Sequence, residues 1–233
     1  HPLLDKLLRN APGTFSHSMQ VGLLAERAAE RVGADALLAQ VGAYYHDIGK
    51  IEHPAYFVEN QIAQINPHAA LSPTLSAKVI KRHVKDGLER GSAWGLPQEI
   101  LDIIAQHHGS TRIEYFYRKA LEGAPDESAV RESDFRYASG LPKSKEAGIM
   151  MLADSIEATV KSLPKPTPKR IEDVVTDTVR RKLQDGQFDE CSLTMHDIHE
   201  AGEAIRESLI GFLGPRIEYP EPSGEDRNGK SAG

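Results

Sequence analysis

Cysteine is almost absent from this chain, which has one Cys among its 233 residues. A single thiol excludes a disulfide framework and a zinc site made of cysteines, and it is typical of a reducing compartment. Long apolar runs are also missing, since none approaches the roughly 20 residues that cross a bilayer. Basic residues are in the minority, with 28 Lys and Arg against 34 Asp and Glu and a formal net charge of −6. This balance argues against a protein that grips duplex nucleic acid through its phosphates.

The chain also lacks an initial Met and a signal-peptide pattern, because it opens with His1 and Pro2. We therefore interpret it as a piece of a longer protein. Its length suggests one domain, or two at most. A hydrophobic content of 39% is sufficient for a core.

The hydrophobic pattern is helical and shows no alternation that would indicate a sheet. In residues 14–32, for example, Val21, Leu24 and Ala28 recur at the spacing of one buried helical stripe. Start and stop signals, such as Ser72 before a proline and Gly33 after the stripe, mark the ends of the segments. We expect helices over 14–32, 36–48 and 143–163, and further helices that begin at 72–73, 96–97 and 167–168 and after residue 194. The prediction is an all-α domain over residues 1–220 and a disordered tail over 221–233, where Pro, Gly, Ser and charge dominate.

Histidine is unusually frequent, with ten copies. His46 and Asp47 end a predicted helix whose other side is apolar, and an imidazole beside a carboxylate is costly to bury unless a cation compensates both. Alone, this dipeptide fits a satisfied core histidine as well as a metal ligand. His17, beside the stripe of the first helix, and Asp154, in the most apolar helix, complete a set that can hold one divalent metal with open positions for water.

Three further imidazoles, His83 and the adjacent His107 and His108, suggest a second metal. Asp47 is the natural bridge between the two metals, because a carboxylate has two oxygens to offer. Two metals about 3.5–4 Å apart lower the pKa of a shared water and bind the oxygens of a phosphate. The predicted chemistry is metal-assisted phosphoester hydrolysis with Asp47 as a catalytic residue. Mixed His and carboxylate ligands suit Fe or Mn as well as zinc.

Three other residues are candidates for contacts with a substrate. Gly49 would let the chain turn, so that Lys50 stands beside the metals and its charge stabilises a phosphate; the alternative is a solvated surface lysine. Tyr115 could stack on a purine ring, with core packing as the alternative for this aromatic segment. Arg136 could bind a phosphate or form a structural salt bridge.

The histidines and aspartates resemble, in their order, the H…HDxGK…H…HH…D pattern of the HD superfamily of metal-dependent phosphohydrolases. Shorter words are similar to the cytoplasmic HD domain of PgpH-type proteins. They are APGT at 11–14, VGAYYH at 41–46, ENQ at 59–61, QHHG at 106–109, DFRY at 134–137, DGQFD at 185–189 and IEYP at 217–220. The similarity runs from residue 1 to about residue 221, nearly the whole chain.

This resemblance implies an HD-domain helical bundle with a two-metal site in its core. It implies hydrolysis of cyclic di-AMP to the linear dinucleotide pApA, by a hydroxide that bridges two divalent transition-metal ions, Fe or Mn. The first metal would be held by His17, His46, Asp47 and Asp154, the second by Asp47, His83, His107 and His108, and Lys50 would contact the substrate phosphate. The family also implies a cytoplasmic domain that follows an extracellular domain and seven transmembrane helices in a protein of the bacterial cell membrane.

Other functions stay open on the sequence. A mononuclear HD nucleotidase would share the first set of ligands and leave His83, His107 and His108 without a role. A cyclic di-GMP enzyme of the HD-GYP type would carry a Glu-rich segment after the histidine pair and a Gly-Tyr-Pro word. Here Gly109 and Ser110 follow the pair and no such word occurs, which favours adenine over guanine as the base. A sensor domain that binds a nucleotide without turnover is the third alternative. The sequence also leaves a homodimer open.

Overall fold

The computed structural model describes residues 1–61 and 66–213. Over these residues the regular structure is helical, with one isolated β-bridge between Arg112 and Arg136. The all-α prediction is confirmed. The α-helices are α1 (Pro2–Asn10), α2 (Pro12–Val32), α3 (Ala36–Tyr45), α4 (Pro73–Ala93), α5 (Gln98–Gln106), α6 (Glu114–Glu122), α7 (Lys145–Lys161), α8 (Pro168–Gln184) and α9 (Met195–Phe212). Short 3-10 helices lie at η1 (Ile48–Glu52), η2 (Pro54–Tyr56), η3 (Val58–Asn60), η4 (Pro67–Ala70), η5 (Glu127–Ala129) and η6 (Glu132–Phe135).

The helix ends follow the capping signals in the sequence. At the start of α4, the backbone N–H of Leu75 donates a hydrogen bond to the Ser72 hydroxyl, and a proline occupies the first turn. Gly33 ends α2 at φ +65°, a left-handed conformation that glycine adopts without steric cost. A reciprocal capping box of Thr194 and Asp197 begins α9. These expected boundaries are confirmed to within two residues.

Three features differ from the sequence prediction. The helix expected over 36–48 ends at Tyr45, because the backbone of Asp47 leaves helical geometry (φ −108°, ψ 16°) and the chain tightens into η1. The short helices α1 and α6 were not predicted. Each is nine residues long, and each buries few side chains: Leu3 and Leu7 in α1, and Phe116 in α6.

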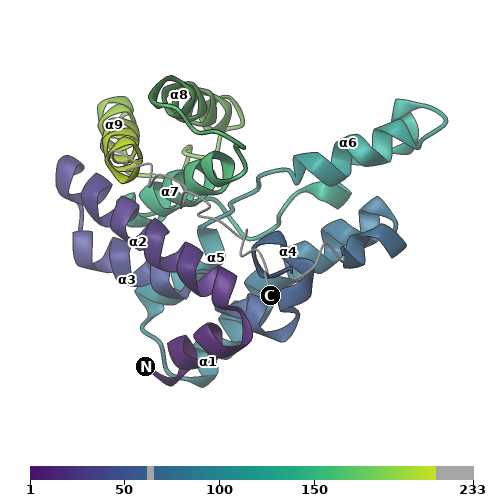
Figure 1. The fold of residues 1–233 in the computed structure, drawn as a ribbon, viewed down its shortest axis with the longest axis horizontal. Coiled ribbons are helices and arrows are strands. Elements are labelled where there is room, and N and C mark those ends of the chain that lie inside the picture. Colours follow the sequence, from purple (N-terminus) through teal and green to yellow (C-terminus); the bar gives the residue numbers. More distant parts are fainter. Residues whose placement is uncertain (62–65, 214–233) are drawn as a thin grey trace, which may run out of the picture.

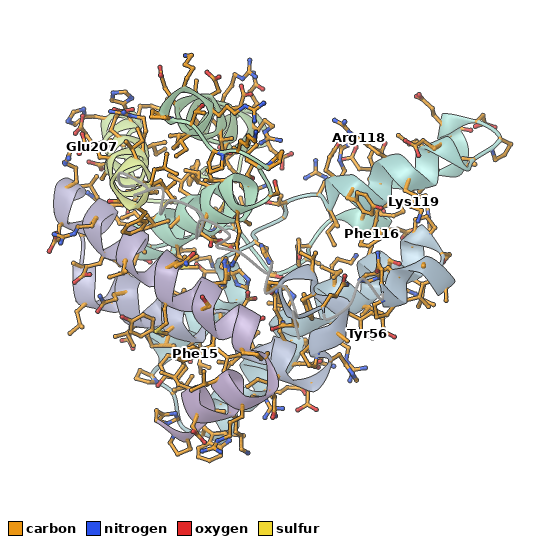
Figure 2. The ribbon with its side chains drawn as sticks, in the orientation of Figure 1. Phe15, Tyr56, Phe116, Arg118, Lys119 and Glu207 are labelled. Carbon is orange, nitrogen blue, oxygen red and sulfur yellow. The ribbon has the colours of Figure 1, made fainter. Side chains whose placement is uncertain are left out.

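The core has three parts, formed by the helices that Figure 1 labels. The largest is formed by α2, α3, α7, α8 and α9. A second joins α1, α3 and α5 to η1, and a third lies between α4, α6 and η6. Figure 2 shows Phe116 on the side of α6 that faces α4, with Arg118 on the opposite side. The ends of α3 and α5 and the middle of α2, α4 and α7 meet where these parts adjoin.

Two predictions about the C-terminus fall on residues that the structure does not describe. The expected tail over 221–233 and the IEYP word at 217–220 both lie outside the described residues. Within residues 1–61 and 66–213, no helix combines the length and the apolar character that a membrane crossing requires.

Candidate metal centre

All seven predicted metal ligands converge in the structure from five helices. His17 comes from α2, His46 and Asp47 from the end of α3, His83 from α4, His107 and His108 from the end of α5, and Asp154 from α7. Six of the seven are buried, and His108 is partly exposed. Their ligand atoms form two groups, His17 with His46 and Asp47, and His83 with His107 and His108.

The Asp47 carboxylate lies between these two groups of histidines. Its Oδ2 atom is 3.1 Å from His46 Nε2 and 3.8 Å from His17 Nε2. Its Oδ1 atom is 3.4 Å from His83 Nε2 and 3.9 Å from His107 Nε2. Each oxygen therefore faces one group, which is the arrangement that a bridging carboxylate needs.

The Asp154 carboxylate also reaches both groups. Its Oδ1 atom is 3.1 Å from His17 Nε2, and its Oδ2 atom is 3.7 Å from His108 Nδ1. Burial opposes ionisation of Asp154, but the hydrogen bond from His17 and the neighbouring imidazoles together outweigh it and lower the pKa of this carboxyl group. Asp154 is therefore an anionic carboxylate in the middle of an apolar helix, and it is suited to bind a metal.

Three of the histidines are held in one tautomer by their own helices. Each donates its Nδ1 proton to the backbone carbonyl three residues earlier, at 2.6–2.8 Å: His46 to Ala43, His83 to Ile80, and His107 to Ile104. This hydrogen bond leaves the lone pair of Nε2 free to bind a metal. Burial lowers the pKa of His83 and lowers that of His107 to about 3, so both rings are neutral.

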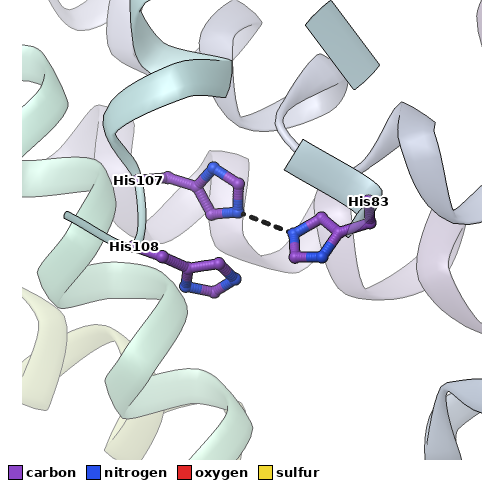
Figure 3. A group of neighbouring side chains, drawn as sticks. All are labelled: His83, His107 and His108. Carbon is purple, nitrogen blue, oxygen red and sulfur yellow. Dashed lines mark hydrogen bonds between the residues drawn. The ribbon is translucent and has the colours of Figure 1, made fainter. Parts of the chain in front are cut away.

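The neutral rings of His83 and His107 point their Nε2 atoms at each other across 3.3 Å (Figure 3). With both Nδ1 protons engaged, neither Nε2 carries a proton, so two lone pairs face each other. A cation between them removes this repulsion. Two nitrogens bound to one metal at about 2.1 Å, with an angle of about 90–109° between the bonds, lie about 3.0–3.4 Å apart. The observed distance falls in that range.

Two further buried atoms lack a partner among the described residues. His46 Nε2 and Asp47 Oδ1 are inaccessible to solvent and have no hydrogen bond there. Buried polar atoms are normally satisfied, and these two lie on the inner side of the cluster. The donor set of imidazoles and carboxylates, its facing lone pairs and its unsatisfied atoms fit divalent transition-metal ions.

Glu157, one turn after Asp154 on α7, was not among the predicted site residues. Its Oε2 atom accepts a hydrogen bond of 2.6 Å from His17 Nδ1, while His17 Nε2 faces Asp154. Burial alone would lower the pKa of His17, but the hydrogen bonds to Asp154 and Glu157 raise it to about 10. Glu157 thus lies where the outer carboxylate of a histidine that binds a metal would lie. Its place one turn beyond Asp154 in an apolar helix is the only signal in the sequence.

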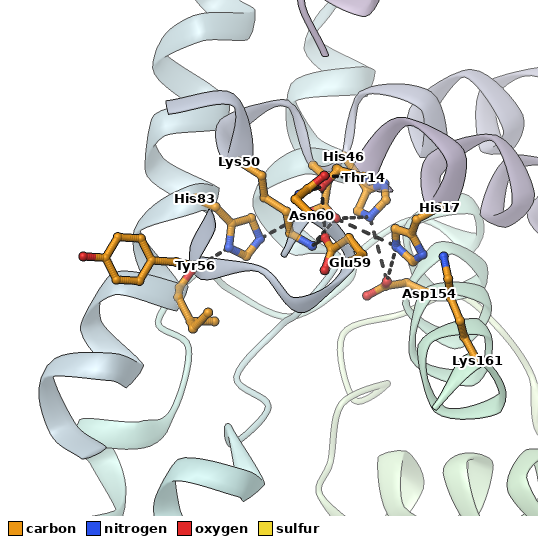
Figure 4. A network of polar contacts seen from close by, with 12 residues as sticks. Thr14, His17, His46, Lys50, Tyr56, Glu59, Asn60, His83, Asp154 and Lys161 are labelled. Carbon is orange, nitrogen blue, oxygen red and sulfur yellow. Dashed lines mark hydrogen bonds and ion pairs between the residues drawn. The ribbon is translucent and has the colours of Figure 1, made fainter. Parts of the chain in front are cut away.

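Lys50 is held against the cluster by two carboxylates (Figure 4). Its Nζ atom lies 2.6 Å from Asp47 Oδ2 and 2.8 Å from Glu59 Oε1. Glu59 also accepts a hydrogen bond of 2.9 Å from the hydroxyl of Thr14. Asn60 donates to the same hydroxyl at 2.8 Å, so the segment around η3 is fastened to the start of α2. Lys50 is therefore a positioned cation, not a solvated surface lysine.

The geometry also corrects the role expected of Gly49. This glycine does not have a positive φ, so a turn is not what requires it. A Cβ at position 49 would lie 1.9 Å from the carbonyl oxygen of His83 and 2.6 Å from the amide nitrogen of Gly87. Gly49 instead lets η1 pack against the backbone of α4, and this contact brings His83 beside Asp47.

Charge balance keeps the centre ionised. Burial would raise the pKa of Asp47, but the charge of the Lys50 ammonium beside it holds the pKa well below the ordinary value. Burial would likewise lower the pKa of Lys50, and Asp47 and Glu59 raise it. Asp47 is therefore a carboxylate and Lys50 an ammonium over the whole neutral range.

A cavity of about 570 Å³ opens onto this cluster. Its walls include His17, His83, His108, Asp154 and Lys50. The ring of His108 stacks on Tyr137, with centroids 4.3 Å apart and an angle of 30° between the planes. Tyr137 reaches this position because the bridge between Arg112 and Arg136 joins the segment after His108 to the segment after η6. Sequence reasoning did not select Tyr137.

The other two predicted substrate contacts lie away from the ligands. Tyr115 is 65% exposed on α6 and is not among the residues that line the cavity at the cluster. Arg136 forms ion pairs with Glu132 at 2.6 Å and with Asp185 at 2.8 Å, and it lines a neighbouring cavity. The structural salt bridge considered for Arg136 is thus present, and its contact with a substrate stays a prediction.

Comparisons with known proteins agree with this geometry. A family model described as the HD domain matches residues 14–159. The cyclic-di-AMP phosphodiesterase PgpH of Bacillus subtilis (strain 168) is 47% identical over 221 residues, which are 95% of this chain and 31% of the relative. The protein of the same name from Listeria monocytogenes serotype 1/2a (strain 10403S) is 45% identical, with 95% and 30% covered. The chain thus spans about a third of the length of these curated relatives.

A solved structure is also similar over most of the chain. The crystal structure of the L. monocytogenes phosphodiesterase PgpH HD domain in complex with cyclic-di-AMP aligns with a TM-score of 0.88 and 45% identity. The alignment covers 91% of this chain and 98% of that one.

Proposed function

Because the chain belongs to the HD-domain family, we propose that it is a metal-dependent phosphodiesterase that hydrolyses cyclic di-AMP to the linear dinucleotide pApA. The observation that carries the proposal is the Asp47 carboxylate, whose two oxygens face separate groups of histidines. The likeness to an HD domain solved with cyclic-di-AMP supports the choice of substrate.

The proposal assigns the seven ligands to two divalent transition-metal ions, Fe or Mn. His17, His46, Asp47 and Asp154 would hold the first ion, and Asp47, His83, His107 and His108 the second. When bound, such a pair supplies Lewis acidity toward the phosphate and lowers the pKa of a water for attack on phosphorus. The cytoplasmic, membrane-linked setting implied by the resemblance is part of the same proposal.

The chain's own residues would position the substrate. The Lys50 ammonium spends two of its three N–H groups on Asp47 and Glu59, so the third is available to a phosphate oxygen in the cavity. Phe57, Ile80 and Ile113 line the same cavity and offer apolar surface to a purine. Glu157 keeps the Nδ1 proton on His17, which directs the Nε2 lone pair inward.

The test is hydrolysis by Mn²⁺-loaded and Fe²⁺-loaded protein of cyclic di-AMP, cyclic di-GMP and a deoxynucleoside triphosphate, with metal content measured on the same samples. We expect about two metals per chain and fastest hydrolysis of cyclic di-AMP to pApA. Asp47→Ala should lower turnover about 10³-fold, because a metal site supplies several kcal/mol of stabilisation to the transition state. Asp102→Ala, at an exposed carboxylate on α5, is the matched control.

Each alternative gives a different result in this assay. One metal per chain with cleavage of the triphosphate would indicate a nucleotidase. Fastest hydrolysis of cyclic di-GMP would show that the preferred substrate carries guanine and not adenine. Binding of cyclic di-AMP without turnover, in protein that carries two metals, would indicate a sensor domain. Near-normal turnover in Asp47→Ala would refute the bridging role of this residue.

A further inference from the structure

Lys182, on α8, is a buried cation that belongs to none of the ligand groups. The residue is 7% exposed, and its Nζ atom donates one hydrogen bond, of 2.9 Å, to the hydroxyl of Thr111. Within residues 1–61 and 66–213, no carboxylate oxygen lies within 4 Å of this ammonium group. Burial lowers the pKa of Lys182 to about 8. The charges of Asp154 and Asp185 offset part of the cost of burial. A buried ammonium group with no carboxylate in direct contact is still costly, which suggests that a bound anion completes this site.

Lys182 stands where two cavities meet. Lys182, Thr111, Arg112 and Ser155 line both the cavity at the metal centre and a second cavity of about 490 Å³. Ser155 directly follows Asp154, so one side of the junction is continuous with the metal ligands. The two cavities therefore adjoin at these four residues, with the candidate metal centre on the far side of the first cavity.

The second cavity has the chemistry of an anion site. Five basic residues line it against two acidic ones: Arg112, Arg118, Arg136, Arg181 and Lys182 against Glu114 and Asp185. Thr178, one turn before Lys182 on α8, also lines this cavity, although its hydroxyl oxygen is buried and the residue is 3% exposed. This buried hydroxyl has no hydrogen-bond partner among the described residues. Arg112, Arg118 and Arg136 form ion pairs with Glu114, Glu132 and Asp185. Among the described residues that line this cavity, Arg181 and Lys182 are left without a carboxylate in contact, and their charge attracts an anionic group.

We propose that Lys182 and Thr111 bind the phosphate of the cyclic dinucleotide that is not cut, and that the second cavity receives the half of the substrate beyond it. This inference rests on the proposed function. A cyclic dinucleotide carries two phosphodiesters joined through two riboses, so a substrate with one phosphodiester at the metals must place the other elsewhere in the adjoining cavities. Lys182 is then a substrate-binding residue that favours dinucleotides over substrates with a single phosphodiester.

The test compares cyclic di-AMP with bis(p-nitrophenyl) phosphate, which has one phosphodiester and no second phosphate. In Lys182→Met, we expect the KM for cyclic di-AMP to rise about 10- to 100-fold, the effect of losing a charge-assisted hydrogen bond. Hydrolysis of bis(p-nitrophenyl) phosphate and metal content should stay at wild-type values. Methionine keeps much of the side-chain volume and removes a buried charge, which a folded core tolerates. Lys169→Met, an exposed lysine on the same helix, is the matched control.

Thr111→Val provides a second variant of similar shape, and we expect a smaller rise in the same KM. Equal losses on both substrates, or loss of metal, would show that Lys182 acts on the metal centre and would overturn the inference. If Lys182→Met has the wild-type KM for cyclic di-AMP, the inference on Lys182 is overturned while the proposed function stands. Wild-type protein that cuts only bis(p-nitrophenyl) phosphate would overturn the proposed function and this inference together.

Discussion

Replacing Glu157 with Gln should weaken the binding of one metal ion while the fold and the other site persist. Glu157 Oε2 lies 2.6 Å from His17 Nδ1, and the residue is 3% exposed. Glutamine has nearly the same shape, so the change removes the negative charge and leaves the packing of α7 in place. His17 keeps its position between α2 and α7, but its imidazole becomes a weaker donor to a metal.

The size of the effect follows from two opposing terms. Loss of an outer partner of a ligating histidine typically costs 10- to 100-fold in metal affinity, which is about 1.4–2.7 kcal/mol. In metal-free protein, however, the pKa of His17 is about 10, so a proton competes with the metal for Nε2 at neutral pH. Removing Glu157 lowers that pKa and weakens the competition. The net loss of metal affinity should therefore be smaller at pH 7.0 than at pH 8.5, because competition from the proton weakens as the pH rises toward the pKa of His17.

The assay is equilibrium competition for Mn²⁺ against a chromophoric chelator at both pH values, with circular dichroism to follow the fold. We expect one of the two Mn²⁺ equivalents to bind about 10-fold more weakly at pH 7.0 and to lose more affinity at pH 8.5. Glu122→Gln, at an exposed position on α6, is the control. Affinity unchanged at both pH values, or a loss shared equally by both equivalents, would refute the reasoning.

Two further predictions concern the same network. In metal-free protein, the protonated His17 stabilises the fold, because its pKa is raised to about 10. This stabilisation is complete below pH 6.5 and is lost as the pH rises toward 10. The free energy of unfolding then falls by at most about 1.4 kcal/mol per pH unit for one proton. Urea titrations with a chelator between pH 6.5 and 9.5 measure this contribution. The difference in free energy of unfolding between wild type and His17→Asn should vary with pH, and a constant difference would contradict the prediction. Glu59→Gln should raise the KM for cyclic di-AMP about 10-fold, because Lys50 loses one of two carboxylate partners. Metal content should not change, and a loss of metal would show that Glu59 supports the ligands and not Lys50.

Much of the fold could be predicted from the sequence, and so could the seven residues that converge on the candidate metal centre. Helix α2 buries Val21, Leu24 and Ala28 where the apolar period places them, and α4 begins at its serine and proline. The ligands lie in an order and spacing along the chain that a family pattern captures. Helices α1 and α6 were not predicted, although Leu3, Leu4, Leu7 and Leu8 recur at helical spacing in α1.

The residues that support the ligands could not be predicted in this way, because each depends on a contact between distant parts of the chain. Glu157 lies 140 positions from His17, and Glu59 lies 45 positions from Thr14. A helical period shows which face of α7 is buried but not which side chain of α2 lies opposite. Lys182 is an extreme case. A lysine on a mostly polar helix is predicted to be exposed, but α8 packs against α7 and the side chain is buried.

Gly49 shows why the candidate ligands can be predicted from the sequence and the residues that support them cannot. Its type was noted in the sequence, but the reason assigned to it was local, a turn, whereas the actual reason is the backbone of α4. Ligand residues are constrained by the chemistry of the metal, which is the same wherever the chain places it, so residue type and order identify them. Supporting residues are constrained by one neighbour in one fold, so only geometry identifies them. Variants of Glu157, Glu59 and Lys182 therefore test the structure itself, whereas variants of the seven ligands test only the family pattern.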